Sequence, residues 1–169
     1  MHKVYQNFQP AHEFIFLRDI NTKILDESKC KDVKLKTYAR LVKLIGKNEL
    51  LTSMASVSEY KSSDFVFILS DIKDCLSSIT PVTKSNIAIF EDDERYIIVD
   101  LSNINISDKD ISQPCMIFGI LKRIEKGIPV LIAHVLSYTG SKSKEVIENS
   151  IQLLTAYQSN FELSPIPQK

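Results

Sequence analysis

The chain has 169 residues, of which 44% are hydrophobic and 25% are charged, proportions typical of one globular domain with a real core. Its 21 lysines and arginines balance 21 acidic residues, and this zero net charge argues against a protein that grips nucleic acid alone through a basic surplus. The 3 cysteines form no CxxC pair, which argues against a disulfide framework and a zinc site, and the longest apolar run, 65–69, is too short to span a bilayer.

The N-terminal extension, 1–32, is expected to pack on the domain that follows it. Its residues 13–20 (EFIFLRDI) predict a short strand or turn that clips the extension to the core. Residues 21–32 are polar and lysine-bearing, and they predict a loop with a weak helical turn. The first residues lack the apolar segment that a secretory signal needs, and the cysteine pattern favours a reducing compartment.

The clearest strand is 33–45, where apolar and polar residues alternate with a period of two. The inner face carries Val33, Leu35, Thr37, Ala39 and Leu41, and the wet face carries Lys34, Lys36, Tyr38 and Arg40. The phase slips at Val42, and a slip of one residue turns the inner face of a strand over. A long strand with such a slip is typical of a small barrel in which one strand bends to serve two sheets.

An elaborated connection, 47–84, follows this strand. Within it, 64–70 (DFVFILS) favours a strand and 71–79 has the apolar spacing of a helix, while 49–56 is apolar and small with no clear period.

The second half of the chain predicts a β-hairpin with an acidic tip, two further strands and a final helix. These segments are, in order, 86–90 and 96–101 around the tip 91–95, then 115–124, 129–138 and a helix from about 141 to 161.

Five strands in this order favour a mainly β fold, a single five-stranded OB barrel with a C-terminal α-helix and an elaborated connection after the first strand. The barrel is expected at 33–139, a partner-binding helix at 140–161 and a proline-containing tail at 162–169. Another small β-barrel and an α+β sandwich stand as alternatives.

Catalysis has little support in the sequence, and we expect a protein that is not an enzyme and that takes no cofactor or metal. There are 4 glycines and no glycine-rich phosphate loop, G-x-S-x-G or HExxH motif. His134 alternates with apolar residues and is interpreted as a satisfied core or edge side chain. The acidic run 91–94 offers oxygen ligands for a hard cation, but it better suits a solvated hairpin tip that blocks edge pairing.

A cluster of cations surrounds the first barrel strand and includes Lys29, Lys31, Lys34, Lys36, Arg40, Lys43 and Lys47. Tyr38 lies among them, and aromatic rings among cations suit single-stranded nucleic acid, because bases stack on rings while phosphates pair with cations. Lys122, Arg123 and Lys126 are expected to extend this surface, since the connections after the first and fourth OB strands flank the binding groove. An ordinary solvated strand face explains the same pattern.

The final helix carries an apolar stripe with helical spacing, formed by Ile147, Ile151, Leu154, Tyr157 and Phe161. One interpretation is that the stripe plugs the end of the barrel. The other is that it binds a partner helix, with the aromatic residues as anchors.

The order of Leu35–Leu41 (LKTYARL), a hairpin, 116–121 (MIFGIL), 131–136 (LIAHVL) and the striped helix resembles the Ten-one family, the smallest subunit of the CST telomere complex, which is similar to the smallest subunit of replication protein A. Family positions correspond to Tyr38-Ala39-Arg40-Leu41, with alanine where glycine is usual, to Gly119, and to Ala133-His134-Val135. The connection 47–84 departs from the family as a large insertion.

The resemblance implies a non-catalytic subunit in the nucleus, at the telomere. It implies that the helix pairs with the middle-sized CST subunit, called Stn-one, and that the complex, with its large subunit, binds single-stranded telomeric DNA. It also implies support of C-strand synthesis by polymerase alpha-primase. The isoleucine-, lysine- and serine-rich composition suits a ciliate version, in which the complex is also attached to telomerase. No membrane role is implied.

Two rival functions fit the same fold. One is an autonomous binder of single-stranded nucleic acid, for which Tyr38, Arg40, Lys122 and Arg123 are the candidate residues. The other is an adaptor barrel that binds a peptide and no nucleic acid.

Overall fold

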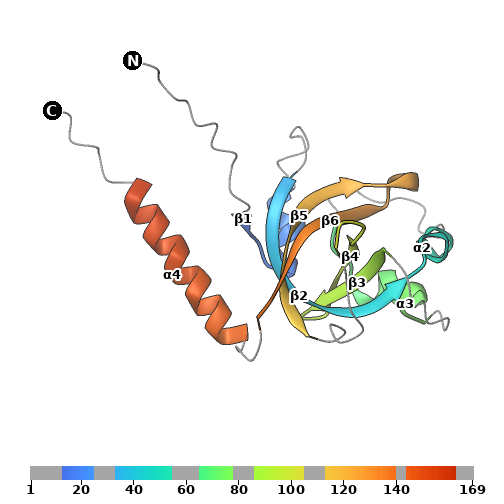
Figure 1. The fold of residues 1–169 in the computed structure, drawn as a ribbon, viewed down its shortest axis with the longest axis horizontal. Coiled ribbons are helices and arrows are strands. Elements are labelled where there is room, and N and C mark those ends of the chain that lie inside the picture. Colours follow the sequence, from blue (N-terminus) through green and yellow to red (C-terminus); the bar gives the residue numbers. More distant parts are fainter. Residues whose placement is uncertain are drawn as a thin grey trace, which may run out of the picture. The chain divides into compact units, whose positions relative to one another are not determined.

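The computed structural model describes residues 13–24, 33–54, 65–77, 86–104, 113–139 and 144–162, and the chain divides into two compact units, Met1–Tyr138 and Thr139–Lys169 (Figure 1). The first unit contains β1 (Glu13–Phe14), α1 (Leu17–Ile24), β2 (Val33–Ile45), α2 (Lys47–Met54), α3 (Leu69–Ser77), β3 (Ile87–Asp92), β4 (Arg95–Asp100), β5 (Pro114–Arg123), the 3-10 turn η2 (Glu125–Gly127) and β6 (Pro129–Tyr138). The second unit contains α4 (Lys144–Glu162).

The sheet closes on itself as a five-stranded barrel. Neighbouring strands follow the order β2–β3–β4–β6–β5, and β5 pairs back with β2 along eight residue pairs, from Val33↔Leu121 to Arg40↔Pro114. The β4–β6 pair is parallel and the other pairs of the ring are antiparallel. The short β1 adds a parallel strand beside β2. This mainly β ring with a C-terminal helix confirms the predicted OB architecture.

β2 serves two ladders and bends between them. It pairs with β5 over Val33–Arg40 and with β3 from Arg40 to Ile45, and its register with β3 shifts between Leu41 and Lys43. Val42, the extra residue, is 39% exposed. A bulge adds one residue on one strand and bends it. The phase slip predicted from the sequence is therefore confirmed as a β-bulge.

The predicted hairpin with an acidic tip is also confirmed. β3 and β4 pair in register from Ile87↔Asp100 to Asp92↔Arg95. Asp93 and Glu94 form the two-residue turn, with φ of 49° and 58°. Two successive positive φ angles are those of a type I′ turn, which matches the twist of the flanking strands.

The barrel interior is filled by inward residues of all five barrel strands and by residues of the N-terminal segment. α1 contributes Leu17 and Ile20, both essentially buried. The side chain of Asn21 holds the segment after the insertion in place: its Oδ1 accepts from the N–H groups of Phe65 and Val66 at 2.9 and 3.0 Å, and its Nδ2 donates to the Val66 carbonyl at 2.9 Å.

The prediction for 13–24 was partly wrong. The strand that clips the extension to the barrel is present as β1, but α1 continues to Ile24 where a loop with a weak helical turn was expected. Burial of Leu17 and Ile20 in the barrel stabilises a helix that the polar sequence after Ile20 favours only weakly.

A second core lies on the outer side of β3 and β4. α2 contributes Leu50 and Met54, and α3 contributes Ile72 and Cys75. They belong to one buried cluster with outward residues of the barrel, which are Ile45, Ile87, Ile89, Ile98, Ile128 and Val130. In its described residues, the inserted connection is therefore helical and packed on the barrel.

The strand predicted at 64–70 is not formed. Within 65–70, the part of this segment that the structure describes, only Phe67 pairs with a strand, through two 2.8 Å backbone hydrogen bonds with Tyr96, and α3 begins at Leu69. Ile68 and Leu69 are exposed, and Asp71 accepts from the Ile68 N–H in the first turn of α3. A helix start so close to Phe67 limits the extended backbone to one bridge. The helical spacing predicted for 71–79 corresponds to α3.

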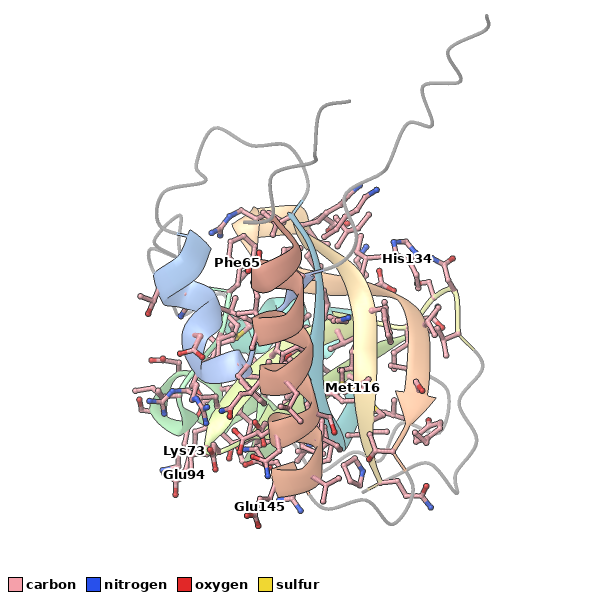
Figure 2. The ribbon with its side chains drawn as sticks, turned by 90° about the vertical axis from the view of Figure 1, so that its left-hand side faces the viewer. Phe65, Lys73, Glu94, Met116, His134 and Glu145 are labelled. Atoms are coloured by element: carbon pink, nitrogen blue, oxygen red, sulfur yellow. The ribbon has the colours of Figure 1, made fainter. Side chains whose placement is uncertain are left out.

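The last two strands, β5 and β6, agree with prediction to within one residue at each end. Their register shifts between Phe118 and Gly119, so that Gly119 pairs with Ala133 and Phe118 with Val135. His134 is the extra residue of this bulge and its side chain is exposed on β6, not in the core (Figure 2). A Cβ at Gly119 would lie 2.3 Å from the Ile132 carbonyl oxygen, so this close approach requires glycine.

Candidate interfaces for nucleic acid and for a protein partner

The usual ligand groove of an OB barrel is filled in this protein. In the OB fold, oligonucleotides bind on the face of the second and third barrel strands, between the connections that follow the first and fourth strands. Here those strands are β3 and β4, and their outward residues Ile89 and Ile98 are completely buried. The connection after the first barrel strand contains α2 and α3, whose apolar residues share the second core with them.

Tyr38, which the alternation placed on the wet face, is only 7% exposed. It lies on the outward side of β2 between the core residues Thr37 and Ala39, opposite Met116, and it belongs to neither of the two core clusters. The prediction of an exposed Tyr38 was wrong, because alternation shows which side of a strand a residue faces and not what covers that side.

Arg40 is exposed but engaged. Its Nε donates to Glu91 Oε2 at 2.8 Å, and the two residues are register partners across β2 and β3. The Glu91 side chain is 15% exposed, and its Oε1 accepts from the Glu94 N–H at 3.1 Å. The Arg40 guanidinium therefore holds the Glu91 carboxylate, which in turn accepts a hydrogen bond from the turn of the acidic hairpin.

Arg123 is held at the opposite end of the β2–β5 ladder. Its guanidinium lies 4.9 Å from the centre of the Phe65 ring, and Nη1 donates to the Gly127 carbonyl at 2.9 Å. Lys122 is exposed beside it. Arg40 pairs with Pro114, the first residue of β5, and Lys122 lies near the other end of the same strand. At about 3.3 Å per residue along a strand, Arg40 and Lys122 are roughly 25 Å apart. The structure does not bring the predicted nucleic-acid residues together.

Two other cations of the predicted cluster have structural partners. Lys43 Nζ donates to the carbonyls of Cys75 and Leu76 at 3.3 and 3.2 Å, at the C-terminal end of α3, where a cation is favourable. Lys47 Nζ contacts Glu125 Oε1 at 2.9 Å and joins the start of α2 to η2. Lys29 and Lys31 lie outside the described residues, as does the side chain of Lys126.

The predicted partner helix is present as α4, which begins at Lys144, three residues after the predicted start, and ends at Glu162. The helical spacing of Ile147, Ile151, Leu154, Tyr157 and Phe161 places them on one side of this helix. Val146 and Leu153, which widen the stripe, are 51% and 72% exposed. The side chains of Leu154, Tyr157 and Phe161 lie outside the described part of the structure.

Sequence analysis missed an outward aromatic pair in the N-terminal segment. Ile15 and Leu17 face the core, whereas Phe14 and Phe16 are half-buried and their rings meet edge to face with centroids 4.7 Å apart. The Arg18 guanidinium lies 4.7 Å from the centre of the Phe16 ring. The alternation in EFIFLR is the available signal, although on its own it indicated no more than a short strand or turn.

Reactive groups are sparse in the part of the chain that the structure describes. No three histidine, cysteine or acidic side chains there are grouped to hold a metal ion. Cys75 and Cys115 are buried, and burial raises the pKa of the Cys75 thiol against the lowering effect of a hydrogen bond with Ser53. Among the same residues, no helix has the length and apolarity that a membrane crossing requires.

Fold and surfaces together define a single OB-type barrel that is closed on its groove side by its own insertion and followed by a separate helix. Two solved structures have a similar chain path. The telomere capping protein Ten1 from Saccharomyces pombe is 13% identical, with a TM-score of 0.45, over 86% of this chain and 99% of that one. The S. pombe Stn1-Ten1 complex gives 12% identity and a TM-score of 0.44 over 88% of this chain and 95% of the matched chain. No family model and no curated protein matches the chain.

Proposed function

We propose that this chain is a non-catalytic OB-fold subunit of a CST-like telomere complex, and that it joins the complex by pairing α4 with a helix of the middle-sized, Stn-one-like subunit. The residues of the pairing are Ile147, Ile151, Leu154, Tyr157 and Phe161. The assembled complex, with its large subunit, binds single-stranded telomeric DNA in the nucleus and supports C-strand synthesis with polymerase alpha-primase. In the ciliate version it is attached to telomerase.

The observation that carries this proposal is that the first unit fills its interior from its own residues. Leu17 and Ile20 of α1 and Phe65 and Val66 complete the buried cluster of the barrel strands, and all described members of that cluster belong to residues 1–138. An amphipathic helix with a wide stripe buries it against another element, and a partner helix meets that requirement.

The sequence pattern supplies the identity of the partner. The resemblance of LKTYARL, MIFGIL, LIAHVL and the striped helix to the Ten-one family points to the middle-sized CST subunit. The zero net charge agrees with a subunit whose nucleic-acid surface is completed by other chains. The filled groove weighs against the rival function, autonomous binding of a single strand in the usual OB site.

The test is affinity purification of the tagged full chain from its own cells, with mass spectrometry of stoichiometric partners. Ile151→Asp places a charge in the stripe and should abolish recovery of an OB-fold partner. Gln152→Asp adds the same charge on the opposite side of α4, where the side chain is exposed, and should leave recovery unchanged. Both variants should keep the circular dichroism spectrum of the barrel. Wild-type recovery of the partner by Ile151→Asp would refute pairing through this stripe.

A further inference from the structure

Two consecutive apolar side chains, Ile68 and Leu69, lie on the surface at the start of α3. They are 47% and 52% exposed, and among the described residues no other two neighbours in the chain are both large, apolar and exposed. Single exposed apolar residues are common on proteins, whereas adjoining ones form a patch. The apolar run of DFVFILS thus ends in two residues that the barrel does not bury, and we call them the α3 pair.

Ile68 occupies a position that ordinarily belongs to a polar residue. Because α3 begins at Leu69, Ile68 is at the N-cap, where serine, threonine, aspartate and asparagine are preferred since their side chains accept a hydrogen bond from the first turn. Asp71 accepts the Ile68 N–H at 3.5 Å, as the acidic residue of a capping box does, but Ile68 has no side-chain oxygen with which to accept in return. A local rule that is broken without a gain in stability points to a binding role.

The α3 pair lies beside the acidic hairpin. Phe67 and Tyr96 form an antiparallel bridge through two backbone hydrogen bonds of 2.8 Å, so the next residue, Ile68, lies beside Arg95. Arg95 is in turn the register partner of Asp92 across the hairpin. The arginine next to the pair therefore has an acidic residue of its own opposite it.

The exposed charges around the α3 pair are predominantly negative. Asp71 and Asp74 on α3 and Glu94 in the hairpin turn are exposed, and the exposed base of α3 is Lys73. Opposite charges across an interface favour the right partner and speed its association. A partner that covers the α3 pair is therefore favoured by positive charge around its own apolar contact.

We propose that the α3 pair is the docking site of a basic amphipathic helix from a partner protein. The apolar side of that helix covers Ile68 and Leu69, and its lysines or arginines face Asp71, Asp74 and Glu94. This inference goes beyond the proposed function and does not depend on it, because the α3 pair belongs to the first unit and the proposed contact with the Stn-one-like subunit is in α4.

The experiment is fluorescence anisotropy of a labelled helical peptide of leucine and lysine, with the leucines along one side, titrated with the full-length chain. Leu69→Gln removes the apolar side chain but keeps a good helix former, and it should weaken binding about tenfold. Binding should also weaken as salt is raised, because the charges of the complex are near the surface. The corresponding peptide of leucine and glutamate should not bind.

Ile68→Ser separates a binding role from a structural one. The serine hydroxyl can cap α3, so this variant should melt about 2–4 °C higher than the wild type. Its affinity for the leucine–lysine peptide should nevertheless fall about tenfold, because half of the apolar contact is lost. If Ile68→Ser instead melts lower and binds with unchanged affinity, the isoleucine serves only the fold and the proposal is wrong.

Val135→Ser is the matched control. Val135 is 51% exposed on β6, so its replacement removes a similar apolar area from another element and should leave the affinity unchanged. Equal losses in Val135→Ser and Leu69→Gln would overturn the proposal, as would undetectable binding by the folded wild-type chain or equal binding of the glutamate peptide. Sedimentation velocity of the chain alone tests the other occupant: a dimer that Leu69→Gln dissociates would mean that a second copy covers the pair, against the proposal.

Discussion

Arg40 and Glu91 face each other across β2 and β3, with 2.8 Å between Nε and Oε2. The same carboxylate accepts the N–H of Glu94, so one acidic side chain joins a barrel strand to the turn of the neighbouring hairpin. Arg40, which the sequence suggested for phosphate contact, thus belongs to the hydrogen-bonded group that orients the acidic tip.

Loss of the Glu91 charge should destabilise the hairpin modestly. Glu91→Gln weakens one charge-assisted hydrogen bond, and because the Arg40 side chain is 59% exposed we expect a loss of only about 0.5–1 kcal/mol in the free energy of unfolding. Urea denaturation measures it. Glu94→Gln changes an exposed acidic residue of the same tip and should change stability by less. A Glu91→Gln loss no larger than that of Glu94→Gln would contradict the role given to this pair.

Gly119 should not tolerate any side chain. In Gly119→Ala the new Cβ would meet the Ile132 carbonyl at 2.3 Å, and because backbone must move the variant should lose about 2–3 kcal/mol. Gly46→Ala is the control, since its Cβ would meet only the Glu49 side chain at 3.8 Å. Thermal unfolding of both variants decides the matter, and equal melting temperatures would show that β5 and β6 separate easily at this point.

Truncation of Ile72 should loosen the insertion. Ile72 is completely buried in the second core, so Ile72→Ala should cost about 2–4 kcal/mol. Leu69→Ala, on the same helix but 52% exposed, should change stability by less than about 1 kcal/mol. Hydrogen exchange should show faster exchange at the amides of α3 and of the strands that it covers, β3 and β4, in Ile72→Ala. Unchanged protection there would mean that α3 does not cover these strands in solution.

Thr37 offers a stabilising substitution. Its Oγ1 is completely buried in the barrel without a hydrogen-bond partner. Thr37→Val replaces that hydroxyl by a methyl of the same shape, so stability should be unchanged or rise by about 1 kcal/mol. Chemical denaturation would detect the change, and a loss above 1 kcal/mol would show that the hydroxyl is bonded in solution.

Stability should fall at alkaline pH partly through Cys75. Burial raises the pKa of this thiol above its ordinary value of 9.0, so the unfolded chain loses the proton first. Deprotonation then favours the unfolded state, and the free energy of unfolding falls as pH rises above about 9. We expect the free energy of unfolding to fall less steeply above about pH 9 in Cys75→Ala than in the chain with Cys75, when both carry Cys30→Ser. Identical slopes would remove Cys75 from the alkaline response.

The sequence predicted the barrel well because its signals are local. The slip at Val42, the Asp93–Glu94 turn and the two long strands β5 and β6 each depend on residues that are close in the chain. The order of these elements then restricted the topology to few solutions.

The surfaces were predicted poorly because they depend on distant contacts. Alternation placed Tyr38 outward but gave no information on what covers it. The cations Arg40, Lys43 and Arg123 each have partners more than three residues away, on other elements or turns. The parallel β1–β2 ladder makes Phe14 the register partner of Lys36, and no periodicity in the sequence shows this contact.

The second core also imposes an order on folding. α2 and α3 are synthesised before the residues of β3, β4 and β6 that share their buried cluster, and the last of these, Val130, lies far along the chain. During translation the apolar sides of the two helices therefore stay exposed until β3, β4 and β6 have been synthesised. Apolar segments that stay exposed during synthesis are prone to aggregation, so the insertion gains its protection only when the later strands of the barrel emerge from the ribosome.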